Sequence, residues 1–126
     1  MLLGMTTELQ VGDCMYRLSV SAHAGRWVSY ATRADTGQRF GVECAGATET
    51  EAFDRLVRWL RWQSDHTAAL RVLQECEREY HRTVAGSAFT APSHDLLIVE
   101  QRRASLDQVD AARRRLDEVR ASRPGE

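Results

Sequence analysis

The chain contains no lysine, because all 17 of its basic residues are arginine. Without lysine the protein cannot form a Schiff base with pyridoxal phosphate. It also lacks the lysine that binds phosphates in a Walker A loop and the strand lysine of protein kinases. These absences exclude three large classes of enzyme.

The chain is also poor in cysteine and has no long apolar run. Its three cysteines, Cys14, Cys44 and Cys76, form no C-x-x-C pair. No apolar stretch approaches the roughly 18 residues of a membrane-spanning helix, and the first residues lack the pattern of a secretory signal. We therefore expect a cytoplasmic protein with reduced cysteines and no membrane segment.

Neither sign of charge dominates, since 17 basic residues stand against 18 acidic ones and the net charge is −1. The balance holds along the chain: residues 1–48 carry 4 basic and 4 acidic side chains, residues 49–92 carry 6 and 7, and residues 93–126 carry 7 and 7. Nucleic-acid-binding modules are usually basic. The charge therefore argues against a nucleic acid partner.

Period-two alternation predicts three strands after a loose entry segment at residues 1–13. Two tight turns, at residues 23–25 and 34–37, join these strands into an antiparallel meander. One face of the sheet is apolar and is expected to form the core: Tyr16, Leu18, Val20, Val28, Tyr30, Phe40, Val42 and Cys44.

A long helix is expected to cover this face. Thr48 and Glu51 have the spacing of a capping box at a helix start. Four apolar residues then recur with helical periodicity: Phe53, Leu56, Val57 and Leu60. No glycine or proline interrupts residues 48–83, so the helix can exceed the common globular length. A second apolar stripe follows on another side with the alternating spacing of a coiled coil: Trp59, Trp62, His66, Ala69, Leu73, Cys76 and Tyr80.

A C-terminal helix is expected to pair with the long one. Gly86 and Pro92 end the first helix, and we favour a continuous second helix from about residue 94. The alternative is a buried strand at residues 95–99 and a helix start at Ser105. An antiparallel hairpin would place Tyr80 near Val99, Leu73 near Leu106, and the Trp59 and Trp62 end near Leu116 and Val119.

The predicted fold class is α+β, with the meander packed on the long helix and a C-terminal helix completing a helical hairpin. A single domain is expected over residues 1–126, with the sheet and its covering helix at 15–60 and the hairpin extension at 59–121. A two-helix layer rarely buries both faces, so we expect a homodimer. Its expected interface residues are Trp59, Trp62, His66, Leu73, Tyr80, Leu106, Val109 and Leu116.

The first hypothesis for function is an interaction or assembly module that acts through this hairpin, on a second copy or an unidentified protein partner. The second is a nucleic-acid-binding or regulatory module. Arg17, Trp27, Arg33 and Arg39 are expected on the outer face of the sheet, where an aromatic ring among guanidinium groups can stack a base.

An enzyme is the third hypothesis, with a site at a subunit junction near Trp59, Trp62 and His66. The sequence identifies no catalytic residues and implies no cofactor. The spacing of His66, Cys76 and His81 does not suit a shared metal ion, and no metal site is predicted.

Overall fold

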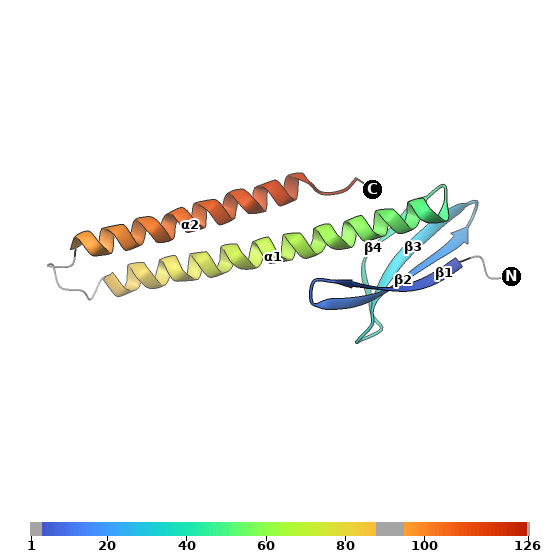
Figure 1. Cartoon of the computed structure of the whole chain (residues 1–126), viewed down its shortest axis with the longest axis horizontal. Helices are drawn as coiled ribbons and strands as arrows, with labels where there is room; N and C mark the ends of the chain where they lie inside the picture. The colour runs from blue at the N-terminus through green and yellow to red at the C-terminus, as the bar shows by residue number, and fades with distance from the viewer. Residues whose placement is uncertain (1–3, 88–94, 126) are drawn as a thin grey trace. The chain divides into compact units, whose positions relative to one another are not determined.

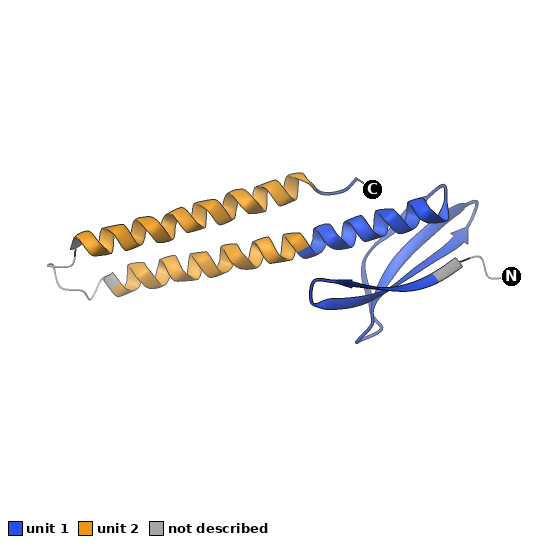
Figure 2. Ribbon diagram, viewed as in Figure 1, with its two compact units in different colours: residues 1–64, 123–126 blue, residues 65–122 orange. Residues whose placement is uncertain are grey.

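The computed structural model describes residues 4–87 and 95–125. Its elements are β1 (Gly4–Val11), β2 (Cys14–His23), β3 (Arg26–Arg33), β4 (Arg39–Gly46), α1 (Glu49–Ser87) and α2 (Asp95–Ala121) (Figure 1). The chain forms two compact units (Figure 2). The sheet unit comprises residues 1–64 and 123–126, and the helical unit comprises residues 65–122. The fold class is therefore α+β, and α1 contributes to both units.

The sheet has four strands in the order β1-β2-β3-β4, where three were predicted. The additional strand, β1, occupies the predicted entry segment and pairs antiparallel with β2 along its whole length. A two-residue turn joins the two strands, and Gly12 there has a φ of 60°. The prediction missed β1 because its alternation is weak: Leu9 and Val11 are the only large apolar residues among the polar ones from Thr6 to Val11.

The face of β3 that meets the helix is the opposite of the predicted one. Leu18 of β2 lies opposite Ala31, and Val20 lies opposite Ser29. Because opposed residues of antiparallel strands share a face, Ala31 and Ser29 lie in the core, and both are fully buried. The placement of Val28 and Tyr30 in the core was therefore wrong.

Small side chains on β3 allow α1 to approach the sheet closely. The Ser29 hydroxyl donates to the backbone oxygen of Ala52 at 2.7 Å and lies 3.3 Å from that of Cys44. Ala52 is itself fully buried, and its backbone nitrogen lies close to Gly46. A larger residue at Ser29 would separate helix and sheet, so size rather than hydrophobicity decides which side of β3 is buried.

A bulge in β4 accommodates Trp59 of α1. The register between β3 and β4 shifts between Ser29 and Ala31, so that Cys44 and Phe40 both lie opposite core-facing residues. Gly41 within the bulge has a φ of 83°, and a Cβ atom there would overlap the Trp59 ring. Phe40 lies between Tyr16 and Trp59, with ring centroids 5.1 and 6.1 Å away.

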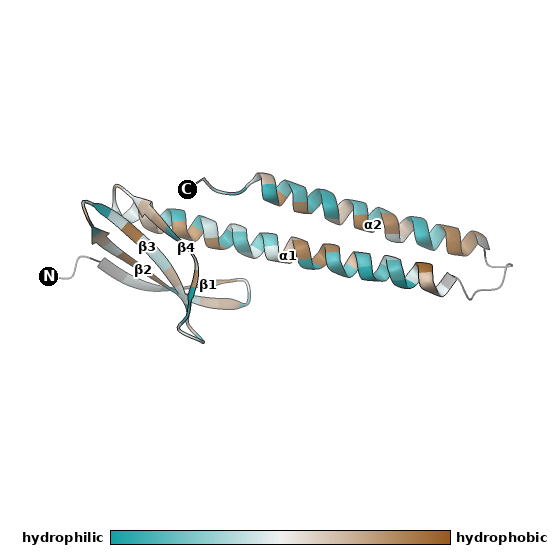
Figure 3. Ribbon diagram, turned by 180° about the vertical axis from the view of Figure 1, so that it is seen from behind, coloured by the Kyte–Doolittle hydropathy of each residue, from teal (hydrophilic) through white to brown (hydrophobic). Residues whose placement is uncertain are grey.

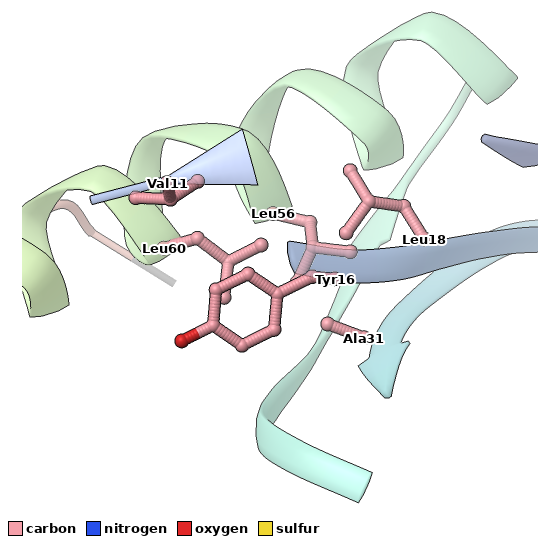
Figure 4. Close-up of a cluster of buried hydrophobic side chains, with 6 residues drawn as sticks. All are labelled: Val11, Tyr16, Leu18, Ala31, Leu56 and Leu60. Carbon is pink, nitrogen blue, oxygen red and sulfur yellow. The ribbon is translucent and has the colours of Figure 1, made fainter. Parts of the chain in front are cut away.

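The core of the sheet unit lies between the sheet and the first turns of α1. Its buried side chains point toward one another in Figure 4: Val11, Tyr16, Leu18, Ala31, Leu56 and Leu60. Leu56 and Leu18 are fully buried. The predicted helix residues Phe53 and Val57 pack against this cluster but are only partly buried.

The predicted capping box at the start of α1 is confirmed. The backbone N–H of Glu51 donates to the Thr48 hydroxyl at 3.1 Å. In return the Glu51 carboxylate accepts a bond from the backbone N–H of Ala47, at 3.2 Å, one residue before the position that the motif predicts. Two otherwise unpaired backbone donors at the helix start are thus satisfied.

In the helical unit, α2 runs antiparallel to the second part of α1, and apolar residues recur between polar ones along both (Figure 3). The seam buries six apolar side chains among the described residues: Ala69, Leu73, Val109, Ala112, Leu116 and Val119. Residues 95–99 are helical, so the favoured reading of this segment is confirmed and the strand alternative is wrong. The predicted break at Pro92 lies outside the described residues.

The register of the two helices differs from the predicted one by about two turns. The hydroxyls of Thr83 and Ser105 lie 3.5 Å apart, and Arg120 Nε lies 3.5 Å from His66 Nε2. Leu73 is therefore level with a residue near Arg114 rather than with Leu106. The prediction assumed that α1 ends and α2 begins at the same level. In the structure, α2 extends about one turn past the C-terminal end of α1.

Candidate interaction surfaces

The four residues of the nucleic-acid hypothesis do not share a face of the sheet. Trp27 lies opposite Ala22, and Arg33 lies opposite the buried Tyr16, so both belong to the helix-facing side. Arg17 and Arg39 each lie opposite Thr32 on the outer side. The four residues are divided between the two faces because β3 buries the face opposite to the predicted one. They therefore do not form the predicted base-stacking surface.

Arginines on the outer face are accompanied by carboxylates. Arg39 lies over the Tyr30 ring, 4.1 Å from its centroid, and forms a 3.1 Å ion pair with Glu43. Arg17 lies 3.9 Å from Glu8. These pairs partly neutralise the basic charge of Arg17 and Arg39. Nucleic-acid-binding surfaces are usually strongly basic, and we do not propose nucleic acid binding.

Arg33 forms a bidentate contact with Asp35 in the turn after β3. Its Nε and one terminal nitrogen lie 3.2 and 2.9 Å from the two carboxylate oxygens. This contact lowers the pKa of Asp35 below its ordinary value and raises the pKa of Arg33. Nearby, burial raises the pKa of Tyr16, and a hydrogen bond with the Cys14 thiol raises it further.

The Arg33→Gln substitution is expected to raise the pKa of Asp35 toward its ordinary value of 3.8. A carboxylate with a lowered pKa stabilises the fold above its unfolded-state pKa, and this contribution is lost as the pH falls through the folded-state value. The effect on stability is small because both groups are exposed. A carboxyl-carbon NMR titration of both proteins measures the shift, and an unchanged Asp35 pKa would contradict the assignment.

A cavity of about 280 Å³ lies beside β4 in the sheet unit. Its described lining residues are Arg26, Val42, Glu43, Cys44, Ala45, Arg55, Trp59, Arg123, Pro124 and Gly125. Arg55 is held by the Ala45 carbonyl oxygen at 2.7 Å and by Glu51 at 2.8 Å. Glu43 is the single carboxylate among the described lining residues, and no histidine is found among them.

Several of the residues predicted to form the dimer interface are buried within a single chain. Leu73, Val109 and Leu116 are at most 8% exposed within the seam of the helical unit, so they have little surface left to lose in an oligomer. Tyr80 is partly buried, and Leu106 is 43% exposed.

The three residues of the enzyme hypothesis each have a contact within their own unit. Trp59 packs on the bulge of β4, and its buried Nε1 has no hydrogen-bond partner among the described residues. The guanidinium of Arg123 lies 5.5 Å from the centroid of the Trp62 ring. His66 contacts Arg120.

A shallow groove of about 210 Å³ runs along one face of the helical unit. We call it the alanine groove, and it is lined by Asp65, Ala68, Ala69, Val72, Ala112 and Arg115. Its floor is apolar, and Val72 is 50% exposed there. Sequence reasoning placed Ala69 on the second apolar stripe of the long helix but missed the other residues of the groove, because it sought large apolar side chains. Small residues flanking a seam are themselves a signal of close packing.

Exposed apolar side chains also gather at the start of α2, where Leu96, Leu97 and Val99 are 82%, 55% and 49% exposed. This segment lies next to residues that the structure does not describe. We therefore define no interaction surface from these side chains.

Comparison of the chain with protein-family models, curated proteins and solved structures finds no match. Within residues 4–87 and 95–125, no three His, Cys, Asp or Glu side chains are grouped as metal ligands would be. No helix in the described part of the chain is both long and apolar enough to cross a bilayer.

Proposed function

We propose that the protein is an assembly module whose helical unit forms a homodimer. The observation that carries this proposal is the alanine groove, an apolar surface on a layer only two helices thick. Helices in proteins depend mainly on packing of their apolar faces, and an apolar patch on a monomer commonly marks an interaction site.

The small core of the helical unit supports the proposal. Its seam buries six apolar side chains among the described residues, and two of them, Ala69 and Ala112, are alanines. Each alanine contributes little apolar area compared with leucine or valine. Small scaffolds of this kind commonly gain stability through oligomerisation.

The composition of the groove supports a helix as its occupant. Ala68, Ala69 and Ala112 have short side chains, so a second helix can approach closely, and the interaxial distance in helix packing depends on the residues at the contact. Val72 projects from the floor and can fill a hollow in the facing layer. A second copy of the chain presents a facing layer of this kind, because it carries the same groove.

A charged residue in the groove is expected to dissociate the dimer. In the Val72→Glu variant, dimer formation would transfer a carboxylate from water to the apolar floor of the groove, which is unfavourable. The matched control is Val99→Glu, because Val99 and Val72 are 49% and 50% exposed and Val99 lies outside the groove. Size-exclusion chromatography with light scattering measures the mass of both variants and the wild type.

The expected masses are a dimer for the wild type and for Val99→Glu, and a monomer for Val72→Glu. Circular dichroism checks that the variants keep their helices. A Val72→Glu protein that remains a dimer would contradict the proposal, as would a monomeric wild type.

A further inference from the structure

Within the proposed dimer, the charges at the edges of the alanine groove specify how the second copy binds. We infer that two copies meet about a twofold axis, with Asp65 of each chain paired to Arg115 of the partner subunit. This inference rests on the proposed function and adds the orientation of the partner and the charged residues that select it.

The two charges lie on different helices and at different levels of the groove. Asp65 belongs to α1 and Arg115 to α2. The contacts of Thr83 with Ser105 and of Arg120 with His66 define the helix register. By this register Arg115 is level with Val72, about two helical turns from Asp65. The opposite charges therefore occupy diagonal corners of the groove.

Diagonal opposite charges make the surface complementary to itself. In a face-to-face dimer, a twofold axis that lies along the other diagonal of the groove, oblique to both helices, exchanges these two corners. This rotation places Asp65 over the partner's Arg115 and Arg115 over the partner's Asp65, and the helices of the two copies then cross at an angle. Closed homodimers use the same patch on both subunits, so each pair occurs twice in the interface.

Neither charge has a strong partner among the described residues of its own chain. Asp65 forms no ion pair among the described residues. Arg115 lies 3.6 Å from Glu118, and these two side chains are 64% and 70% exposed. Exposed pairs of this kind contribute little, so Arg115 can turn toward the groove.

The apolar floor makes the orientation important. The same alanines would accept a second helix in several directions, because short side chains select weakly between them. Opposite charges at defined corners favour one direction, and like charges brought together disfavour the others.

Charge reversal tests the pairing. Asp65→Arg places two arginines together at each corner of the dimer, and Arg115→Asp places two aspartates together. Each single variant is expected to raise the dimer dissociation constant by about tenfold or more. In an equimolar mixture the two variants are expected to form a heterodimer at least about tenfold tighter than either homodimer, because both corners again pair opposite charges.

Sedimentation equilibrium on the wild type, the two variants and their mixture measures these constants, and circular dichroism checks folding. The neutral variants Asp65→Asn and Arg115→Gln replace the reversals if a reversed charge unfolds the helices. Each is expected to weaken the dimer, and their mixture is expected to recover part of the affinity because one corner of the heterodimer keeps the Asp65–Arg115 pair. A mixture of reversed variants that is no tighter than its components would overturn the twofold pairing. If Val72→Glu still dissociated the dimer in that case, the proposed function would stand and this inference alone would fail.

Discussion

Replacing Leu56 with alanine will lower the free energy of unfolding by about 2–5 kcal/mol. Leu56 is fully buried between α1 and the sheet, where it belongs to the cluster that includes Leu18, Ala31 and Leu60. Truncation removes its apolar contacts and leaves a cavity, because the sheet on one side and the helix on the other limit how far the core can collapse.

The control for Leu56→Ala is the same change at Leu106, which is 43% exposed. Leu106→Ala is expected to change the stability by less than about 1 kcal/mol, as is common at exposed sites. Urea unfolding at one fixed protein concentration measures both changes, since oligomerisation links stability to concentration. Equal losses in the two variants would contradict the assignment of the core.

Replacing Gly41 with alanine is expected to have the second large effect, a loss of about 2–5 kcal/mol in the free energy of unfolding. Gly41 has a φ of 83°, a conformation that costs an L-residue about 1–2 kcal/mol. In addition, the new Cβ atom would overlap the Trp59 ring. Displacing a packed side chain in this way costs about 1–3 kcal/mol.

Gly37 provides a matched control for the backbone contribution. It has a φ of 72°, and nothing lies within 4 Å of the position of an added Cβ atom. Gly37→Ala should therefore show the conformational cost alone, and the difference between the two variants measures the clash with Trp59. A Trp59→Leu background should reduce that difference, because it removes the ring. The same loss at both glycines would show that Trp59 does not occupy the bulge.

Local signals in the sequence predicted much of this fold. The capping box of Thr48 and Glu51 defined the start of α1, and the absence of glycine and proline correctly indicated its great length. The turn at Gly37 was also predictable, because a positive φ there favours glycine. These features depend on residues close together in the chain.

Apart from β1, whose alternation is weak, the features that sequence reasoning missed depend on tertiary contacts. Val28 and Tyr30 are more apolar than Ser29 and Ala31, yet the close approach of Ala52 requires small residues on the buried side of β3. This reversal separated Arg17 and Arg39 from the other two residues of the predicted nucleic-acid site. Hydrophobicity alone does not encode the distance between a helix and a sheet.

The interface predicted from the sequence and the interface proposed from the structure both lie on α1 and α2, but they involve different side chains. Large apolar residues such as Leu73 and Leu116 were expected to face a second copy, whereas they fill the seam between α1 and α2. The surface left for a partner contains small and charged residues. Its position depends on the helix register, which the sequence did not specify.

The most direct test of the proposed homodimer is the mass of the wild-type chain in solution. Sedimentation equilibrium over the micromolar concentration range distinguishes a dimer from a monomer of 14.3 kDa. The proposed assembly predicts a mass about twice that value, with dissociation on dilution that follows a single monomer–dimer equilibrium. A mass equal to that of one chain at every concentration would contradict the proposal that the helical unit exists to assemble two copies.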